Sequence, residues 1–218
     1  MNEIQKRIEN RNKEKKRFRA VLKDNKAIVE DMEGINEFYE SSYIGTRETD
    51  GEKQILELLP IEALLLHERD RIFVVKDENK FGDYEITNTI NQEIYDKIRD
   101  NLFSFEELLI YFSKWDSNLW QKYAVYNDLR KRGYYVRSGF GEGFEFRVFK
   151  RGADFRKEFA KYLIYPIFEG TPINLAELDL ITRTAMNDRK ELVIAAVDRL
   201  SKPIYYFVKK FAPEEINI

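Results

Sequence analysis

Few residues of this chain could transfer a proton near neutral pH. Its 218 residues include one histidine, His67, and no cysteine. Histidine is the side chain that usually serves as a general acid or base in that range. However, His67 ends the apolar run Ile61–Leu66, where a structural role is favoured. The lack of cysteine excludes a disulfide framework, a thiolate nucleophile and a cysteine-based metal site.

The charge balance limits which partners the chain could bind. There are 37 Lys and Arg residues against 39 Asp and Glu residues, so any contact with nucleic acid must come from a local patch. Residues 1–20 lean basic and are interpreted as a solvated extension, with an arm that contacts RNA phosphates as the alternative. No apolar run reaches the roughly 18 residues of a membrane-spanning helix, and no signal peptide precedes the first segment. We expect a cytoplasmic protein without a membrane partner.

The segment 123–162 contains the clearest signals of local structure. Tyrosines and a leucine at three-residue spacing predict an amphipathic helix with a basic last turn, which ends at Gly133. Aromatic and β-branched residues predict strands at 134–137 and 144–149, joined by a glycine-rich turn that begins at Gly139.

The pattern YxDLxxRGYxVxxGxxxGxxFRVxxRG runs through these elements with many fixed spacings. It resembles the C-terminal domain of the archaeal-type tRNA-splicing endonuclease family. The residues that carry the resemblance are Tyr126, Asp128, Leu129, Arg132, Gly133, Tyr134, Val136, Gly139, Gly143, Phe146, Arg147, Val148, Arg151 and Gly152. The similarity continues through FYESSYIG, PIEALLLHERDRI and IYYFVKKFAP, so it covers most of the chain after about residue 25.

As the resemblance implies, this family removes tRNA introns without a metal or cofactor and leaves 2′,3′-cyclic phosphate and 5′-hydroxyl ends. A tyrosine acts as general base on the ribose 2′-hydroxyl, a histidine protonates the leaving 5′-oxygen, and a lysine stabilises the charged phosphorane. Here Phe149 occupies the tyrosine position, Phe159 the histidine position, and Lys190 is retained. Because phenylalanine neither donates nor accepts a proton, the pattern predicts a degenerate active site that cannot work by itself.

The retained lysine also has a simpler interpretation. A lysine near a helix C-terminus favours the helix dipole and stays solvated, and without its two partners this is the favoured role of Lys190. Arg183 occupies a position where catalytic relatives place an arginine against the RNA bulge, although it could simply cover the helix surface. The resemblance therefore makes Arg183, Arg189 and Lys190 candidates for RNA contact.

The family, as the resemblance implies, assembles as dimers of two-domain repeats, homotetramers or heterotetramers that hold two active sites at a fixed separation. The leading hypothesis is a structural, non-catalytic subunit of a heterotetramer, whose partners are a catalytic subunit and precursor tRNA. The subunit-interface candidates are Asp198, Ile204, Tyr205, Tyr206, Phe207 and Val208. The loop 198–203 has one acid against two bases, unlike the acidic docking loop of relatives.

Two alternatives remain open. A stand-alone RNA-binding module on a degenerate nuclease fold would use cations with aromatic residues between them; the candidates are Arg130–Arg132, Arg137, Lys150, Arg151, Arg156 and Lys157. The other alternative is an active enzyme with relocated catalytic groups.

The remaining signals predict an α+β fold. Ahead of the central segment they indicate strands at 26–30 and 72–76, helices at 35–43, 60–67 and 86–101, and a turn-rich loop at 44–51. Beyond it they indicate strands at 160–168, 192–197 and 204–208, and a helix from Leu175 with Asn174 as its cap. We expect a small N-terminal α/β domain at 1–102, with the basic extension 1–20, and a C-terminal nuclease-like α/β domain at 103–218 with a mixed central sheet. A capping-box spacing from Ser104 to Glu107 starts the second domain.

Overall fold

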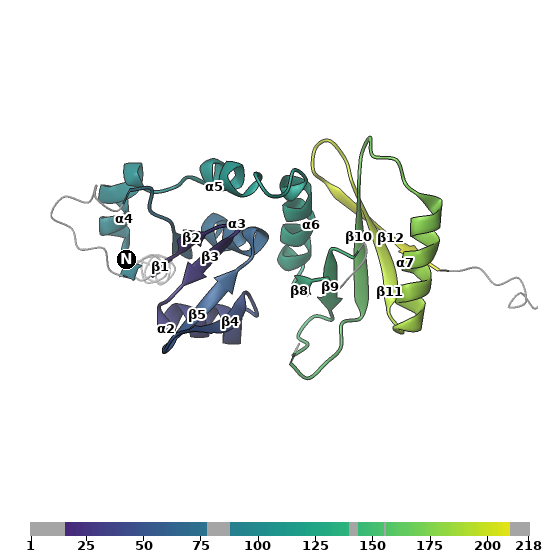
Figure 1. Ribbon diagram of the computed structural model, residues 1–218, viewed down its shortest axis with the longest axis horizontal. Coiled ribbons are helices and arrows are strands. Elements are labelled where there is room, and N and C mark those ends of the chain that lie inside the picture. The colour runs from purple at the N-terminus through teal and green to yellow at the C-terminus, as the bar shows by residue number, and fades with distance from the viewer. Residues whose placement is uncertain (1–15, 78–87, 140–143, 155, 210–218) are drawn as a thin grey trace, which may run out of the picture. The chain divides into compact units, whose positions relative to one another are not determined.

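The computed structural model describes residues 16–77, 88–139, 144–154 and 156–209, and the chain divides into two units between Leu119 and Trp120. Each unit combines helices with β-sheet, which confirms the α+β class (Figure 1). The division falls later than the boundary predicted after residue 102. The reason is that α5, the helix after that boundary, packs against α3 of the first unit.

Two sheets form the N-terminal unit. A four-stranded antiparallel sheet has the order β2-β3-β5-β4, and a three-stranded sheet has the order β6-β1-β7 with β1 parallel to β6. The strands are β1 (Arg17–Arg19), β2 (Val21–Lys23), β3 (Lys26–Val29), β4 (Thr46–Asp50), β5 (Lys53–Leu58), β6 (Ile72–Phe73) and β7 (Thr89–Ile90). The helical segments are α2 (Met32–Ile35), the π-helix η1 (Asn36–Ser41), α3 (Pro60–Glu68), α4 (Gln92–Ile98), the 3₁₀ helix η2 (Arg99–Asn101) and α5 (Phe105–Phe112).

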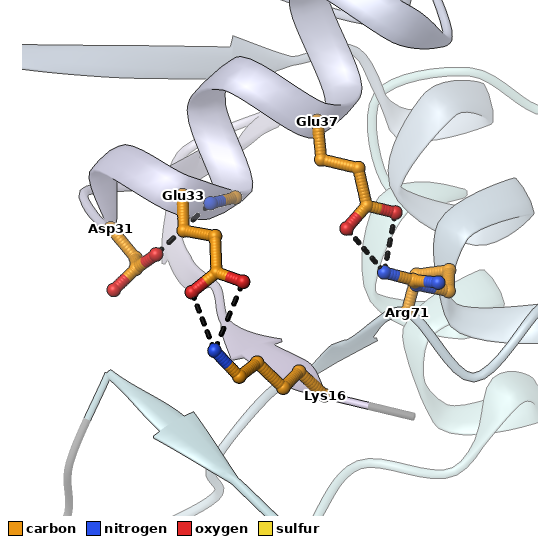
Figure 2. Close-up of polar contacts among 6 residues, drawn as sticks. Lys16, Asp31, Glu33, Glu37 and Arg71 are labelled. Atoms are coloured by element: carbon orange, nitrogen blue, oxygen red, sulfur yellow. Dashed lines mark hydrogen bonds and ion pairs between the residues drawn. The ribbon is translucent and has the colours of Figure 1, made fainter. Parts of the chain in front are cut away.

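Polar contacts hold the segment formed by α2 and η1 (Figure 2). Asp31 caps α2 by accepting a backbone N–H of the first turn at 2.9 Å. Lys16, next to β1, pairs with Glu33 at 2.7 Å, and Arg71, next to β6, pairs with Glu37. Because exposed ion pairs contribute only about 0–1 kcal/mol each, these pairs orient the segment more than they stabilise it.

The sequence missed several strands of the N-terminal unit. Residues 17–19, interpreted as part of a solvated extension, form β1 with Phe18 fully buried, and residues 89–90, predicted to be helical, pair with it as β7. The pair β4 and β5 was missed as well. Residues 44–51 were predicted to be a loop and no element was predicted at 53–58, yet β4 and β5 pair in antiparallel register there. All but one of the β4 residues are exposed, so the strand lacks the apolar alternation that sequence analysis depends on. Strand β4 forms because it can hydrogen-bond to β5, which buried Leu56 and Leu58 hold in place.

The C-terminal unit contains the predicted mixed sheet. Its order is β12-β11-β10-β9-β8, and only β10 and β11 run parallel among these strands. The elements are α6 (Leu119–Lys131), β8 (Tyr135–Ser138), β9 (Phe146–Phe149), β10 (Tyr162–Phe168), α7 (Leu175–Asn187), β11 (Glu191–Val197) and β12 (Pro203–Val208). Helices α6 and α7 cover opposite faces of this sheet (Figure 1). The predicted glycine stop is also observed: Gly133 follows α6 with a φ of 84°.

Candidate functional site

The three positions that the resemblance assigns to catalysis lie at one end of the five-stranded sheet. The strand register places Phe149 of β9 and Lys190, just before β11, on either side of Lys161 at the start of β10. Phe159 comes two residues before Lys161 along the chain. The structure therefore brings together the positions that the sequence singled out, although two of them carry phenyl rings.

Phe149 belongs to the core. Its side chain is 4% exposed, and it packs in a small cluster with Ala153, Ala160 and the half-buried Tyr135. Tyr135 is its cross-strand neighbour in β8. The ring at the general-base position thus fills space between the sheet and the loop that follows β9.

Phe159 has the opposite environment. Its side chain is 93% exposed. The loop that carries it is organised by Asp154, whose carboxylate accepts the backbone N–H of Arg156 at 3.0 Å. The backbone N–H of Asp154 in turn donates to the Glu158 carboxylate at 3.2 Å. The bonds of Arg156 hold the pKa of Asp154 below its ordinary value, so this carboxylate stays ionised and keeps the loop closed.

Lys190 is set in place by the end of α7. The helix closes with two backbone bonds, from Arg189 N–H to the carbonyl of Met186 and from Lys190 N–H to that of Ala185. Arg189 adopts a left-handed conformation with a φ of 55°, as this type of helix end requires. The ammonium of Lys190 lies 3.3 Å from the Asp188 carboxylate. Lys190 also lines a groove of about 290 Å³ between α7 and β12.

The nearby ionisable groups are engaged in ordinary structural contacts. Lys161 contacts Glu191 at 3.2 Å, and its contacts with the Tyr162 hydroxyl and Glu191 raise its pKa, so it stays charged. Tyr165 donates to the Glu177 carboxylate at 3.0 Å. Partial burial and that hydrogen bond raise the pKa of Tyr165, which makes it a poorer base.

The single histidine serves the N-terminal unit. The Nε2 atom of His67 lies 3.0 Å from the carbonyl oxygen of Phe103, and its ring packs 6.4 Å from that of Phe105. Burial lowers the pKa of His67, which favours the neutral ring. These contacts support the structural role that the sequence favoured.

The cations proposed for RNA contact differ in how fully they are paired. Arg183 pairs with Asp179 at 2.7 Å on the exposed face of α7. The guanidinium of Arg151 lies 5.0 Å from the Tyr134 ring centre, and that of Arg130 lies 5.7 Å from Tyr135. The other pairs are Arg132 with Asp128 and both Arg156 and Lys157 with Asp154.

The predicted interface strand β12 is an edge strand. Ile204, Tyr206 and Phe207 are 56%, 54% and 62% exposed, whereas Val208 packs beside the core cluster under α7. Asp198 accepts the backbone N–H groups of Leu200 and Lys202 at 3.0 and 2.8 Å, so its carboxylate shapes the loop before the strand.

Sequence analysis missed a polar network that ties β12 to α6. The hydroxyl of Tyr205 donates to Oδ2 of Asp128 at 2.8 Å, and Arg132 Nε donates to the same oxygen at 2.7 Å. Burial, then the bond to Asp128, raises the pKa of Tyr205, so the hydroxyl stays a donor. The four-residue spacing of Asp128 and Arg132 could have indicated their pairing, but nothing in the sequence pointed to Tyr205, 77 residues from Asp128.

Within the described ranges, no group of three or more His, Cys, Asp or Glu side chains is arranged to hold a metal ion. None of the described helices is both long and apolar enough to cross a membrane.

Comparisons with known proteins match both units. Residues 18–87 match the family model described as tRNA intron endonuclease, N-terminal domain, and residues 119–206 match the catalytic C-terminal domain of the same family. The tRNA-splicing endonuclease of Methanococcus vannielii is 32% identical over 194 residues, which cover 89% of this chain and 94% of that relative. The protein of the same name from Thermococcus onnurineus is 33% identical, covering 86% and 93%. The one from Methanococcoides burtonii is 34% identical over 88% of this chain but only 46% of that relative.

Proposed function

Because the chain belongs to the tRNA intron endonuclease family, we propose that it is a structural, non-catalytic subunit of a heteromeric tRNA-splicing endonuclease. It would hold catalytic subunits in position on precursor tRNA and take no part in proton transfer. The family as a whole removes introns from tRNA; the division of labour between subunits is the proposal.

The observation that carries the proposal is the pair of phenylalanines at the two proton-transfer positions. Phe149 is packed into a core cluster, and Phe159 extends into solvent. Neither ring can exchange a proton, and a general acid or base typically contributes about 10²–10⁴-fold to the rate. Losing both leaves Lys190 with charge stabilisation alone, and that cannot start the attack of the 2′-hydroxyl.

Three ionisable groups of the described residues are poorly suited to these two roles. Tyr165 is bonded to Glu177 with a raised pKa, and Lys161 stays charged beside Glu191. His67 lies in the N-terminal unit, bonded to Phe103. This supports a structural subunit over an enzyme with relocated catalytic groups.

The edge strand β12 supports assembly with a partner. It leaves its outer backbone edge unpaired by the other strands of its sheet and exposes apolar side chains, Ile204 and Tyr206 among them. The match to less than half of the Methanococcoides burtonii protein fits an assembly of several such units. The catalytic partner would supply the missing tyrosine and histidine.

Reconstitution tests this proposal. The purified full chain, a catalytic family member from the same source and their mixture are each incubated with a precursor tRNA that contains a bulge–helix–bulge. We expect no cleavage by the chain alone and cleavage by the mixture at the two intron ends. In the mixture at saturating precursor tRNA, where a change in RNA affinity no longer affects the rate, Phe159→Ala and Lys190→Ala in this chain should leave the rate per active site unchanged. Cleavage by the lone chain, or a rate that falls with Lys190→Ala, would contradict the proposal.

A second experiment distinguishes a structural subunit from a stand-alone RNA-binding module. The mass of the chain is measured by light scattering with and without the co-expressed partner. A stable hetero-oligomer supports the structural subunit. Tight, salt-sensitive RNA binding by a chain that never joins a partner would support the module instead.

A further inference from the structure

We infer that Phe159 is a stacking platform for an unpaired base of RNA, and that the cations around it hold the adjoining phosphates. This rests on the proposed function for its ligand, precursor tRNA. It assigns the degenerate site a binding role in place of the lost chemistry.

The ring of Phe159 lies in solvent. Phe159 is 93% exposed, whereas Phe149 at the companion position is 4% exposed. Burying a phenylalanine stabilises a fold by about 1.5–3 kcal/mol, and the chain gains none of this at position 159. The ring therefore contributes little to the free energy of unfolding, and both of its faces are accessible to a ligand.

The backbone on both sides of the ring is fixed. Asp154 and Glu158 close the preceding turn through the 3.2 Å bond between them. Ala153 and Ala160, at the two ends of this turn, are 4% and 8% exposed and pack in the same buried cluster. Because Ala160, next to the ring, is anchored in this cluster, presenting Phe159 to a ligand costs little conformational entropy.

The ring lies in a positively charged segment. The segment 150–161 has five lysine and arginine side chains against two carboxylates. Lys157 is 82% exposed and keeps only a 3.6 Å contact with Asp154, and Lys150 is exposed as well. Lys190 and Lys161 lie at the same end of the sheet, where they pair with Asp188 and Glu191, so the cations free to meet a ligand are chiefly Lys150 and Lys157. An exposed ring among cations fits a polyanion whose bases have accessible faces, which describes single-stranded or bulged RNA. An apolar protein surface would match the ring but not this excess of positive charge.

Binding of fluorescent RNA to the full chain tests the inference. Anisotropy titrations compare an RNA hairpin that has a three-nucleotide bulge with a fully paired hairpin of equal length, at low and moderate salt. The variants are Phe159→Ala, Phe159→Leu and Phe159→Trp. Leu200→Ala is the matched control, because Leu200 is also an exposed apolar side chain, at 74%, in a different loop of the same unit.

Stacking on one aromatic side chain is worth about 1–3 kcal/mol per base, which corresponds to about 5- to 150-fold in Kd. We expect Phe159→Ala to weaken binding of the bulged RNA by that factor and to leave the paired hairpin nearly unaffected. Phe159→Leu, which keeps apolar surface but has no π face, should resemble alanine. Phe159→Trp should bind at least as well as the wild type, and Leu200→Ala should change nothing.

Three outcomes would overturn the inference. In the first, Phe159→Ala binds the bulged RNA as the wild type does; in the second, leucine substitutes fully for phenylalanine. In the third, Phe159→Ala weakens association with the catalytic partner while RNA binding stays constant, which would make the ring a protein contact. In each case, partner-dependent cleavage would still report separately on the proposed structural role.

Discussion

At the residue scale, burial gives two identical side chains different roles. At the two positions that the resemblance assigns to proton transfer, Phe149 is part of the core and Phe159 lies in solvent. In the proposed non-catalytic role, each position can follow its local environment. Phe149 lies within β9, where an apolar ring is favoured, whereas Phe159 lies in a loop outside the sheet.

Alanine substitution should separate these two roles. Phe149→Ala removes a ring packed against Tyr135, Ala153 and Ala160, and truncation of a buried phenylalanine costs about 3–5 kcal/mol of unfolding free energy. Phe159→Ala should change that free energy by less than about 0.5 kcal/mol, as for other exposed sites. Urea denaturation of both variants at one pH measures the difference. Equal losses would show that Phe159 contributes to the fold, against its exposure.

His67 should make stability depend on pH. Burial lowers its pKa below the ordinary 6.5, and the bonded Phe103 carbonyl offsets this only in part. The unfolded chain then binds more protons than the folded one at mildly acidic pH, so this stabilisation is present above pH 6.5 and is lost as the pH falls through the folded pKa. His67→Gln keeps a donor for the carbonyl without the titration. The difference in unfolding free energy between wild type and variant should therefore change from pH 7.5 to pH 5, and a constant difference would contradict the assignment.

At the element scale, the network of Tyr205, Asp128 and Arg132 fixes the edge strand to α6. Tyr205→Phe removes the hydroxyl but keeps the ring, and loss of a hydrogen bond to a charged group costs about 1–3 kcal/mol. Tyr206→Phe is the matched control because its side chain is 54% exposed. Urea denaturation should show the loss for Tyr205→Phe alone. A double-mutant cycle with Asp128→Asn should show coupling between the two sites, and additive losses would mean that the bond contributes little.

The elements also show how far the sequence could lead. The α6–β8–β9 segment was predicted because its helix, its glycine stop and its strands each carry a local signal. The structure supplies a physical cause for the glycine motif: a Cβ on Gly139 would lie 1.9 Å from the carbonyl oxygen of Phe144. By contrast, β4 contains no buried apolar residue and was missed, since only pairing with β5 makes it a strand. The predicted boundary after residue 102 differs from the division after Leu119, because the local sequence does not indicate that α5 packs on α3.

Part of the candidate site was predictable because it also carries a local sequence signal. The positions 149, 159 and 190 follow from a motif with fixed spacings, and the strand register places them at one end of the sheet. The sequence did not reveal which phenylalanine is buried and which is exposed, because both have a charged neighbour, Lys150 after Phe149 and Glu158 before Phe159. Exposure of Phe159 depends on how its loop folds over Phe149, and that is a tertiary property.

At the scale of the whole molecule, the proposed role depends on an interface with another chain. A non-catalytic subunit acts only through its partners, so a change that prevents assembly should abolish its function while leaving its fold intact. Strand β12 offers a place for such a change, because Ile204 and Tyr206 are more than half exposed and lie on the same face of an edge strand. Their side chains contribute little to the stability of the isolated chain.

Replacing both Ile204 and Tyr206 with lysine should therefore block assembly. Association with the partner would have to bury two ammonium groups without counter-charges, which costs several kcal/mol each, whereas the isolated chain keeps them in water. We expect a urea midpoint within the range of ordinary surface variants, together with loss of the hetero-oligomer in light scattering and of partner-dependent cleavage. Leu175→Lys, at a side chain that is 77% exposed at the start of α7, provides the charge control and should assemble normally. If the double variant still assembles and the mixture still cleaves, subunits must pair through another surface, and β12 is an edge that the assembly leaves open.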